Sequence, residues 1–108
     1  MPEFMKIKIH WIDEPNKSEL ALLEIISPLG FIYVGDGSLI IKRKNPDFVD
    51  NNNRLIELFG DYWHEGDNPQ ERINIFKSFG YETLVIWESE LKSPENVKYK
   101  VEAWIENV

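Results

Sequence analysis

The residues from Thr83 to Trp87 form a continuous apolar run that contains no charged side chain. Such a run is typical of a strand covered on both faces, because a strand with one face in water alternates apolar and polar residues. Asn68-Pro69 and Gly80 mark the start and the end of a helix before the run, and Ser93-Pro94 marks the start of another helix after it. We therefore expect a central strand with helices packed on both faces of its sheet.

The remaining elements predict an α/β fold. Alternating or apolar runs predict further strands at Lys6–Trp11, Phe31–Val34, Leu39–Arg43 and Arg54–Phe59. Gly35-Asp36-Gly37-Ser38 separates two of these runs and predicts a hairpin. The order β-α-β-β-β-α-β-α, without an internal boundary, predicts one domain over residues 1–108, built on a mixed central sheet flanked by helices.

Apolar residues at helical spacing predict which face of each helix is buried. Asn16 is the expected N-cap of the first helix, and Glu19 is placed to complete a capping box with it. The residues expected to face the core are Leu20, Leu23 and Ile26 in the first helix, Ile73, Phe76 and Phe79 in the second, and Val97, Val101, Trp104 and Ile105 in the third.

Composition limits the setting and the partners of the chain. The sequence contains no cysteine, which excludes disulfides and cysteine-bound zinc and leads us to expect a cytoplasmic location. No apolar run approaches membrane-spanning length, so no membrane partner is expected. The second methionine, Met5, leads us to expect that residues 1–4 are a cloning remnant. A formal net charge of −7 predicts that this domain alone binds nucleic acid weakly.

Two acidic residues stand where they could share a cation. Asp47 follows Pro46 at a turn, and Glu57 lies inside the next predicted strand. If they converge, their oxygens suit a hard cation such as Mg²⁺, which activates water against a phosphodiester. Asp47 could instead be a turn residue bonded to its own backbone, and Glu57 could be an edge glutamate that faces solvent. The sequence leaves both alternatives open.

Further candidates surround this pair. His64 follows the strand and can transfer protons near neutral pH. Glu19 and Glu71 each lie three residues after an asparagine, so each could cap its helix, and a capping side chain could still face the site with its free oxygen. The remaining candidates are DNA contacts. Lys42 and Lys44 could bind backbone phosphates, or they could be the solvated end of a strand. Tyr62 and Trp63 could contact bases, or they could be core residues.

Four motifs carry a resemblance to a known family. They are Asn45-Pro46-Asp47-Phe48, Phe59-Gly60-Asp61-Tyr62-Trp63-His64, Phe79-Gly80-Tyr81 and Leu84-Val85-Ile86-Trp87-Glu88-Ser89-Glu90-Leu91. In order and approximate spacing, they resemble the very-short-patch mismatch-repair endonucleases. They are more similar still to the very-short-patch-like homing endonucleases of introns and inteins. The resemblance extends from about Ser18 to Leu91.

The resemblance implies a restriction-endonuclease-like fold of the PD-(D/E)XK group that uses magnesium to hydrolyse double-stranded DNA. Asp47 would be the metal-binding aspartate, and the carbonyl of Leu58 a second ligand. His64 would assist proton transfer, and Glu19 would match a glutamate of the family's N-terminal helix. Tyr62-Trp63 would match an aromatic pair that wedges into DNA.

The chain also departs from the family pattern. Glu57 matches the second acid of the wider group, but Phe59 stands where its lysine is expected, which shifts the proton-transfer role to His64. The repair enzymes hold a structural zinc, which this cysteine-free chain is not expected to bind. The last acid of the family pattern could be Asp67 or Glu71.

Three functions follow from these residues. The first is a magnesium-dependent DNA endonuclease domain of the homing type, whose specificity comes from additional DNA-binding segments or from a homodimer. The second is a mismatch-repair or restriction nicking endonuclease. The third belongs to another class, a catalytically inactive nuclease-like module that binds DNA or protein.

Overall fold

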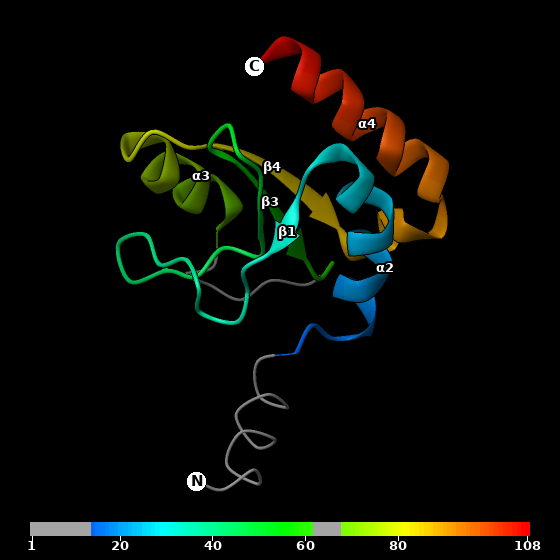
Figure 1. Ribbon diagram of the computed structural model, residues 1–108, viewed down its shortest axis with the longest axis horizontal. Coiled ribbons are helices and arrows are strands. Elements are labelled where there is room, and N and C mark those ends of the chain that lie inside the picture. Colours follow the sequence, from blue (N-terminus) through cyan, green and yellow to red (C-terminus); the bar gives the residue numbers. More distant parts are fainter. Residues whose placement is uncertain (1–13, 62–67) are drawn as a thin grey trace, which may run out of the picture.

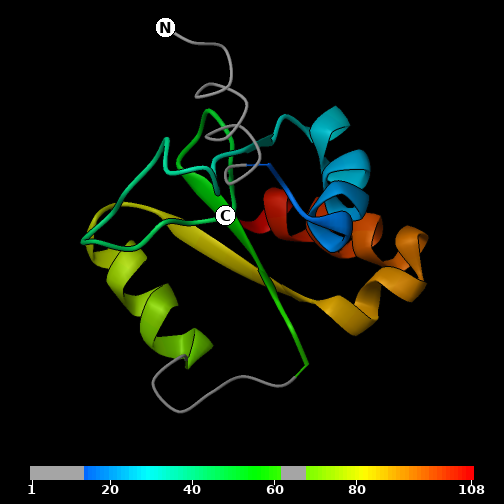
Figure 2. The ribbon, with the colours of Figure 1, turned by 90° about the horizontal axis from the view of Figure 1, so that it is seen from below.

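In the computed structural model, which describes residues 14–61 and 68–108, a mixed sheet lies between helices (Figures 1 and 2). The strands are β1 (Ile32–Tyr33), β2 (Phe48–Val49), β3 (Arg54–Phe59) and β4 (Glu82–Trp87). The helices are α2 (Lys17–Ile26), α3 (Pro69–Ser78) and α4 (Pro94–Asn107), with short 3-10 helices η1 (Ser27–Leu29) and η2 (Glu88–Lys92). α3 covers one face of the sheet, and α2 and α4 cover the other. The predicted α/β fold with a mixed, helix-flanked sheet is therefore confirmed.

The strand order in this sheet is β1-β2-β3-β4. β1 and β2 pair antiparallel, as do β2 and β3, whereas β3 and β4 are parallel. Parallel neighbours need a crossover connection, and α3 lies in the segment that joins β3 to β4. Glu57 pairs with Val85 and Phe59 with Trp87 in the parallel register.

Alternation along β3 divides its side chains between two hydrophobic cores. Ile56 lies in the core under α2 and α4, whose other buried members are Leu22, Ile26, Phe31, Phe48, Ile86, Val97 and Val101. Leu55 lies in a smaller core with Phe76 of α3 and Ile41. Because successive side chains of a strand point to opposite faces, Glu57 shares the α3 face with Leu55. This register places a carboxylate beneath α3.

The helix starts agree with the sequence prediction. Asn16 and Glu19 form the expected capping box of α2. The side chain of Asn68 accepts a hydrogen bond from the backbone N–H of Gln70 at the start of α3. Ser93 precedes Pro94 at the start of α4.

The predicted buried faces hold only in part. Ile26, Phe76, Val97 and Val101 are buried as expected, and Leu23, Trp104 and Ile105 pack partly buried against the main core. Leu20 and Phe79 were expected inside, but they are 49% and 54% exposed. Leu22 takes the inward place in α2, one helical turn before Ile26. Phe79 follows the last residue of α3, so helical spacing no longer governs where it points.

The predicted hairpin between Phe31–Val34 and Leu39–Arg43 is wrong. β1 pairs instead with Phe48–Val49, a strand that the sequence did not reveal. Ile41 and Lys44 exchange backbone hydrogen bonds of 2.8 and 3.0 Å around Lys42 and Arg43. These last two residues have φ of 48° and 66°, so the basic stretch forms a tight turn rather than a strand.

Two other strand predictions have different outcomes. The Lys6–Trp11 prediction lies outside the described residues. β4 was expected at the centre of the sheet, but within the described part of the chain it is an outer strand, paired only with β3. Helices on both sheet faces explain why its sequence is nevertheless continuously apolar.

Two phenylalanines test this packing. Phe48→Ala removes a fully buried ring from the main core and should lower the free energy of unfolding by about 3–5 kcal/mol. Phe79→Ala, at an exposed site, should change it by less than about 0.5 kcal/mol. Urea denaturation monitored by circular dichroism measures both. Equal losses in the two variants would contradict the packing described for Phe48.

Candidate functional site

Asp47 stands directly before β2 and is fixed by its backbone and by its side chain. Its N–H donates to Oε2 of Glu57 at 2.8 Å, and its carbonyl accepts from the N–H of Val34 at 2.8 Å. Its Oδ2 accepts from the backbone N–H of Leu58 at 2.8 Å. Oδ1 receives no hydrogen bond from the described residues. One carboxylate oxygen of a firmly held aspartate is therefore uncommitted within this part of the chain.

Glu57 lies beneath α3, and it is only 2% exposed. Its Oε1 accepts from Nε of Arg72 at 2.7 Å and lies 2.6 Å from Nη2 of the same residue. Its Oε2 accepts from the Asp47 N–H. The solvent-facing alternative for Glu57 is thus excluded, since the side chain is buried and both of its oxygens have partners.

Arg72 was missed in the sequence, although a local signal existed. It lies four positions before Phe76, the buried residue of α3, and therefore on the helix face that turns toward the sheet. Its guanidinium lies over the Phe76 ring, 5.2 Å from the ring centre. Nη2 also donates to the carbonyl of Asn45 at 3.3 Å. Arg72 thus connects α3, β3 and the segment that carries Asp47.

Asn45 is a second residue whose part was not foreseen. Its side-chain nitrogen donates to the carbonyls of Val34 and Leu39 at 2.7 and 2.8 Å. Its side-chain oxygen accepts from the N–H of Gly37 at 3.1 Å. These bonds satisfy backbone groups of Val34 and of the 35–44 loop with a side chain instead of a strand partner. Asn45 thereby fixes the loop immediately before Asp47.

The two acids have raised pKa values for the same main reason. Burial, followed by the charge of Glu57, raises the pKa of Asp47 from 3.8 to about 7, although the Leu58 N–H opposes the shift. Burial also raises the pKa of Glu57, with Arg72 acting in the opposite direction. Ionising both carboxylates is therefore costly in this folded environment, and a bound cation would lower that cost.

Glu19 caps α2 and also reaches the surroundings of Asp47. Its Oε1 accepts from the backbone N–H of Asn16 at 2.8 Å, so the capping role is present. Its charge nevertheless contributes to the raised pKa of Asp47. Burial, with Glu19 as the next cause, raises the pKa of Tyr33 to about 12. Capping and proximity to the site thus coexist in one side chain.

The remaining sequence candidates lie farther out or outside the description. Lys42 is exposed at the tight turn, and Lys44 is half-buried beside it. Glu71 is exposed in the first turn of α3 and does not supply its capping bond, which comes from Asn68. The Phe59 ring packs edge-on against Trp87, with ring centres 5.7 Å apart. The predictions for Tyr62, Trp63, His64 and Asp67 fall outside the described residues.

Leu58 has a feature that suits a carbonyl ligand. The N–H of Asp50 donates to the carbonyl of Arg54. In an antiparallel ladder every second residue pair is hydrogen-bonded, so the next bonded pair after Asp50 and Arg54 is Phe48 with Ile56. If the ladder continued in this register, the residue opposite Leu58 would be Pro46, which has no N–H to donate. The Leu58 N–H points toward Asp47, and N–H and C=O of one strand residue point to the same edge. Pro46 thus leaves the Leu58 carbonyl without its ladder donor, beside Asp47.

These donors fit a magnesium ion in part. Residues 14–61 and 68–108 contain no group of three or more His, Asp or Glu side chains arranged to hold a metal. Mg²⁺, however, is commonly held by one or two carboxylates and keeps several waters. Asp47 Oδ1 and the Leu58 carbonyl meet that requirement. Glu57 would have to exchange a hydrogen bond to become a direct ligand, since both of its oxygens are engaged.

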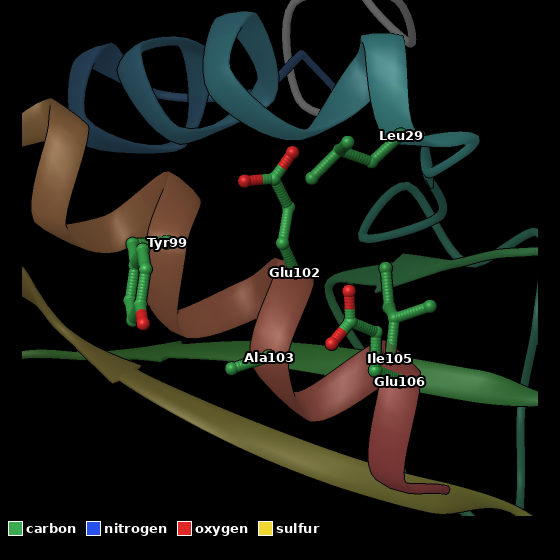
Figure 3. A pocket seen from close by; sticks show the side chains of 6 residues that line it. All are labelled: Leu29, Tyr99, Glu102, Ala103, Ile105 and Glu106. Carbon is green, nitrogen blue, oxygen red and sulfur yellow. The ribbon is translucent and has the colours of Figure 1, made fainter.

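A separate pocket of about 520 Å³ lies along α4 (Figure 3). Its lining comprises Leu29, Tyr99, Glu102, Ala103, Ile105 and Glu106. The Glu102 side chain extends from α4 toward the segment that carries Leu29. Because α4 covers the sheet face opposite α3, this pocket is separate from the acidic residues beneath α3.

The fold is similar to that of a solved nuclease domain. The catalytic domain of the homing endonuclease I-Bth0305I superposes with a TM-score of 0.68 and 20% sequence identity, over 87% of this chain and 99% of that domain. This similarity establishes a shared α/β fold. No protein-family model and no curated protein matches the sequence. Among the described helices, none is both long and apolar enough to cross a membrane.

The raised pKa of Asp47 predicts how stability depends on pH. Its pKa is higher in the folded than in the unfolded chain, so the folded chain binds more protons between about pH 4 and pH 7. The free energy of unfolding should therefore fall as pH rises through this window, with Asp47 contributing up to about 1 kcal/mol per pH unit. Asp47→Asn should reduce this slope and be more stable than the wild type at pH 8.

Asp36→Asn is the matched control, because it makes the same chemical change in an exposed loop. Hydrogen bonds from Ser38 lower the pKa of Asp36, so this variant should keep the falling slope. Urea denaturation at several pH values, with a chelator present, measures all three proteins. A wild-type slope in Asp47→Asn would show that Asp47 ionises without cost in the folded protein.

Proposed function

We propose that this chain is a magnesium-dependent DNA endonuclease domain, the catalytic part of a very-short-patch-like homing endonuclease. The observation that carries the proposal is the pairing of Asp47 and Glu57 where β2 meets β3. A buried and a half-buried carboxylate joined through the Asp47 backbone are costly to a fold that has no use for them. The similarity to a domain described as a homing endonuclease catalytic domain supports the same conclusion.

Asp47 and the Leu58 carbonyl would hold the magnesium ion. When bound, the ion supplies Lewis-acid stabilisation of the charge that develops on the phosphoryl oxygens. Asp47 presents Oδ1 because Leu58 N–H holds Oδ2. Glu57 orients Asp47 through its backbone, and Glu19 adds negative charge near it. His64 would hold or move the proton of the attacking or leaving oxygen, a role that Phe59 cannot take.

DNA contacts would come from outside the acidic centre. Lys42 and Lys44 lie in the tight turn directly before Asn45, where they could meet a backbone phosphate of a duplex that approaches Asp47. Tyr62 and Trp63 would wedge or stack against bases. The formal charge of −7 opposes tight binding by the domain alone. We therefore infer that additional DNA-binding segments or a homodimer supply specificity, and nanomolar binding of a defined site by this domain alone would contradict that inference.

A second candidate function is a nuclease-like module that binds DNA or protein without cleavage. The observation in its favour is that both Glu57 oxygens are already satisfied, by Arg72 and by the Asp47 N–H. Phe59 in place of a lysine and its packing on Trp87 also fit a site adapted for stability. The two candidates differ in one measurable property, which is cleavage that depends on Asp47.

Nicking of supercoiled plasmid DNA with added magnesium tests the endonuclease. Asp47→Asn should abolish nicking because it replaces the anionic ligand with a neutral amide of the same shape. Asp36→Asn should nick like the wild type. Wild-type activity that survives in Asp47→Asn would remove Asp47 from the site. If the wild type and a longer chain with its DNA-binding segments both fail to nick, the binding module is favoured.

His64→Ala should reduce the single-turnover cleavage rate by roughly 100-fold or more, since general acid-base groups typically contribute that much. The pH dependence of the cleavage rate should change as well, because proton transfer by a histidine side chain depends on pH. His10→Ala is the control, as it replaces the other histidine of the chain. A cleavage rate in His64→Ala that equals the wild-type rate would assign proton transfer to another group.

A further inference from the structure

Arg72 stands at the centre of a chain of contacts that ends at Asp47. Its Nε and Nη2 both contact Oε1 of Glu57, at 2.7 and 2.6 Å. This arrangement leaves Oε2 of Glu57 for the N–H of Asp47, at 2.8 Å. Asp47 in turn receives the N–H of Leu58 on Oδ2. The position of the Asp47 carboxylate therefore depends on the orientation of the Glu57 side chain, and Arg72 fixes that orientation.

Besides Glu57, two further groups contact the guanidinium of Arg72. Its Cζ lies over the Phe76 ring, 5.2 Å from the ring centre, and Nη2 also donates to the Asn45 carbonyl at 3.3 Å. A planar guanidinium can make all of these contacts at once, whereas a lysine ammonium carries the same charge but lacks the planar group with several N–H donors in fixed positions. The position thus requires the shape of arginine as well as its charge.

We propose that Arg72 is a positioning residue of the candidate site, which holds Glu57 as an anchor so that Asp47 presents Oδ1. This inference rests on the proposed function, in that it explains how the site is kept in order. Glu57 acts here through the Asp47 backbone. Without Arg72 its buried carboxylate would lose its counter-ion and would turn toward other donors. The Asp47 N–H would then lose its acceptor.

The ion pair between Arg54 and Asp50 is a matched control within the same sheet. Its Nε–Oδ2 distance is 2.6 Å, and the Asp50 side chain is 3% exposed, against 2% for the Glu57 side chain. Asp50 accepts from the backbone N–H groups of Asn52 and Arg54, at 2.9 and 3.0 Å. It therefore orders the β2–β3 turn at the end of the strands away from Leu58. Loss of Arg54 should disturb amides that differ from those disturbed by loss of Arg72.

Amide hydrogen exchange by NMR, without DNA and with a chelator, tests the proposal on the intact chain. In Arg72→Gln, the amides of Asp47 and Leu58 should exchange at least about 10-fold faster than in the wild type, relative to the amides of β4. In Arg72→Lys, which keeps the charge, the increase should be smaller. In Arg54→Gln, the amides of Asn52 and Arg54 should exchange faster, while that of Asp47 should not.

Unchanged exchange at Asp47 in Arg72→Gln would overturn the proposal, and so would equal acceleration of all amides, which indicates general destabilisation. If Arg72→Gln fails to fold, the same comparison is made with Arg72→Lys. The measurement uses neither cleavage nor a metal. If the wild type and a longer chain both fail to nick DNA, the proposed function is defeated, while the positioning role of Arg72 is still decided by exchange alone.

Discussion

The carboxylate of Glu57 lies beneath α3, and the contacts that satisfy it organise the molecule around it. The guanidinium of Arg72 links α3 to β3 by contacting Oε1 of Glu57. The N–H of Asp47 links the segment after the 35–44 loop to the same carboxylate by donating to Oε2. Leaving a buried carboxylate unpaired costs several kcal/mol, so these three segments are bound to one another by the need to satisfy it. The apolar contacts of Leu55 with Phe76 and Ile41 then close the face around the charge.

Two acids next to β2 differ in their surroundings: Asp47 is half-buried and belongs to the candidate site, whereas Asp50 is buried and has a structural role. Asp50 receives hydrogen bonds from Arg54 and from two backbone N–H groups, which satisfy both of its oxygens. Asp47 lies near two further carboxylates, those of Glu57 and Glu19, and its pKa is raised to about 7. A fold selected for stability alone favours the first arrangement. The second is typical of positions where charge is concentrated for function.

The parts of the fold that depend on contacts between neighbouring residues could be predicted from the sequence, whereas those that depend on distant residues could not. The starts of α2 and α3 depend on Asn16 and Asn68, whose side chains cap amides two or three residues away. Such contacts are local, so the sequence pattern is sufficient to predict them. The hairpin at Gly35–Ser38 was wrong although its turn residues are typical of one. Asn45 satisfies the carbonyls of Val34 and Leu39 from farther along the chain, and local turn propensity cannot anticipate that contact.

For the candidate site, the sequence by itself determined the chemistry: an aspartate after a proline, a glutamate within an apolar strand, and a proline that cannot donate to a neighbouring strand. Only the tertiary structure decided that Glu57 is buried rather than exposed and that its counter-ion is Arg72, 15 residues away. Alternation along a strand assigns a side chain to one of two faces, but it does not reveal what covers that face. That depends on the crossover through α3: the parallel pairing of β3 and β4 requires such a connection, and this helix, with Arg72, lies over the Glu57 side of the sheet.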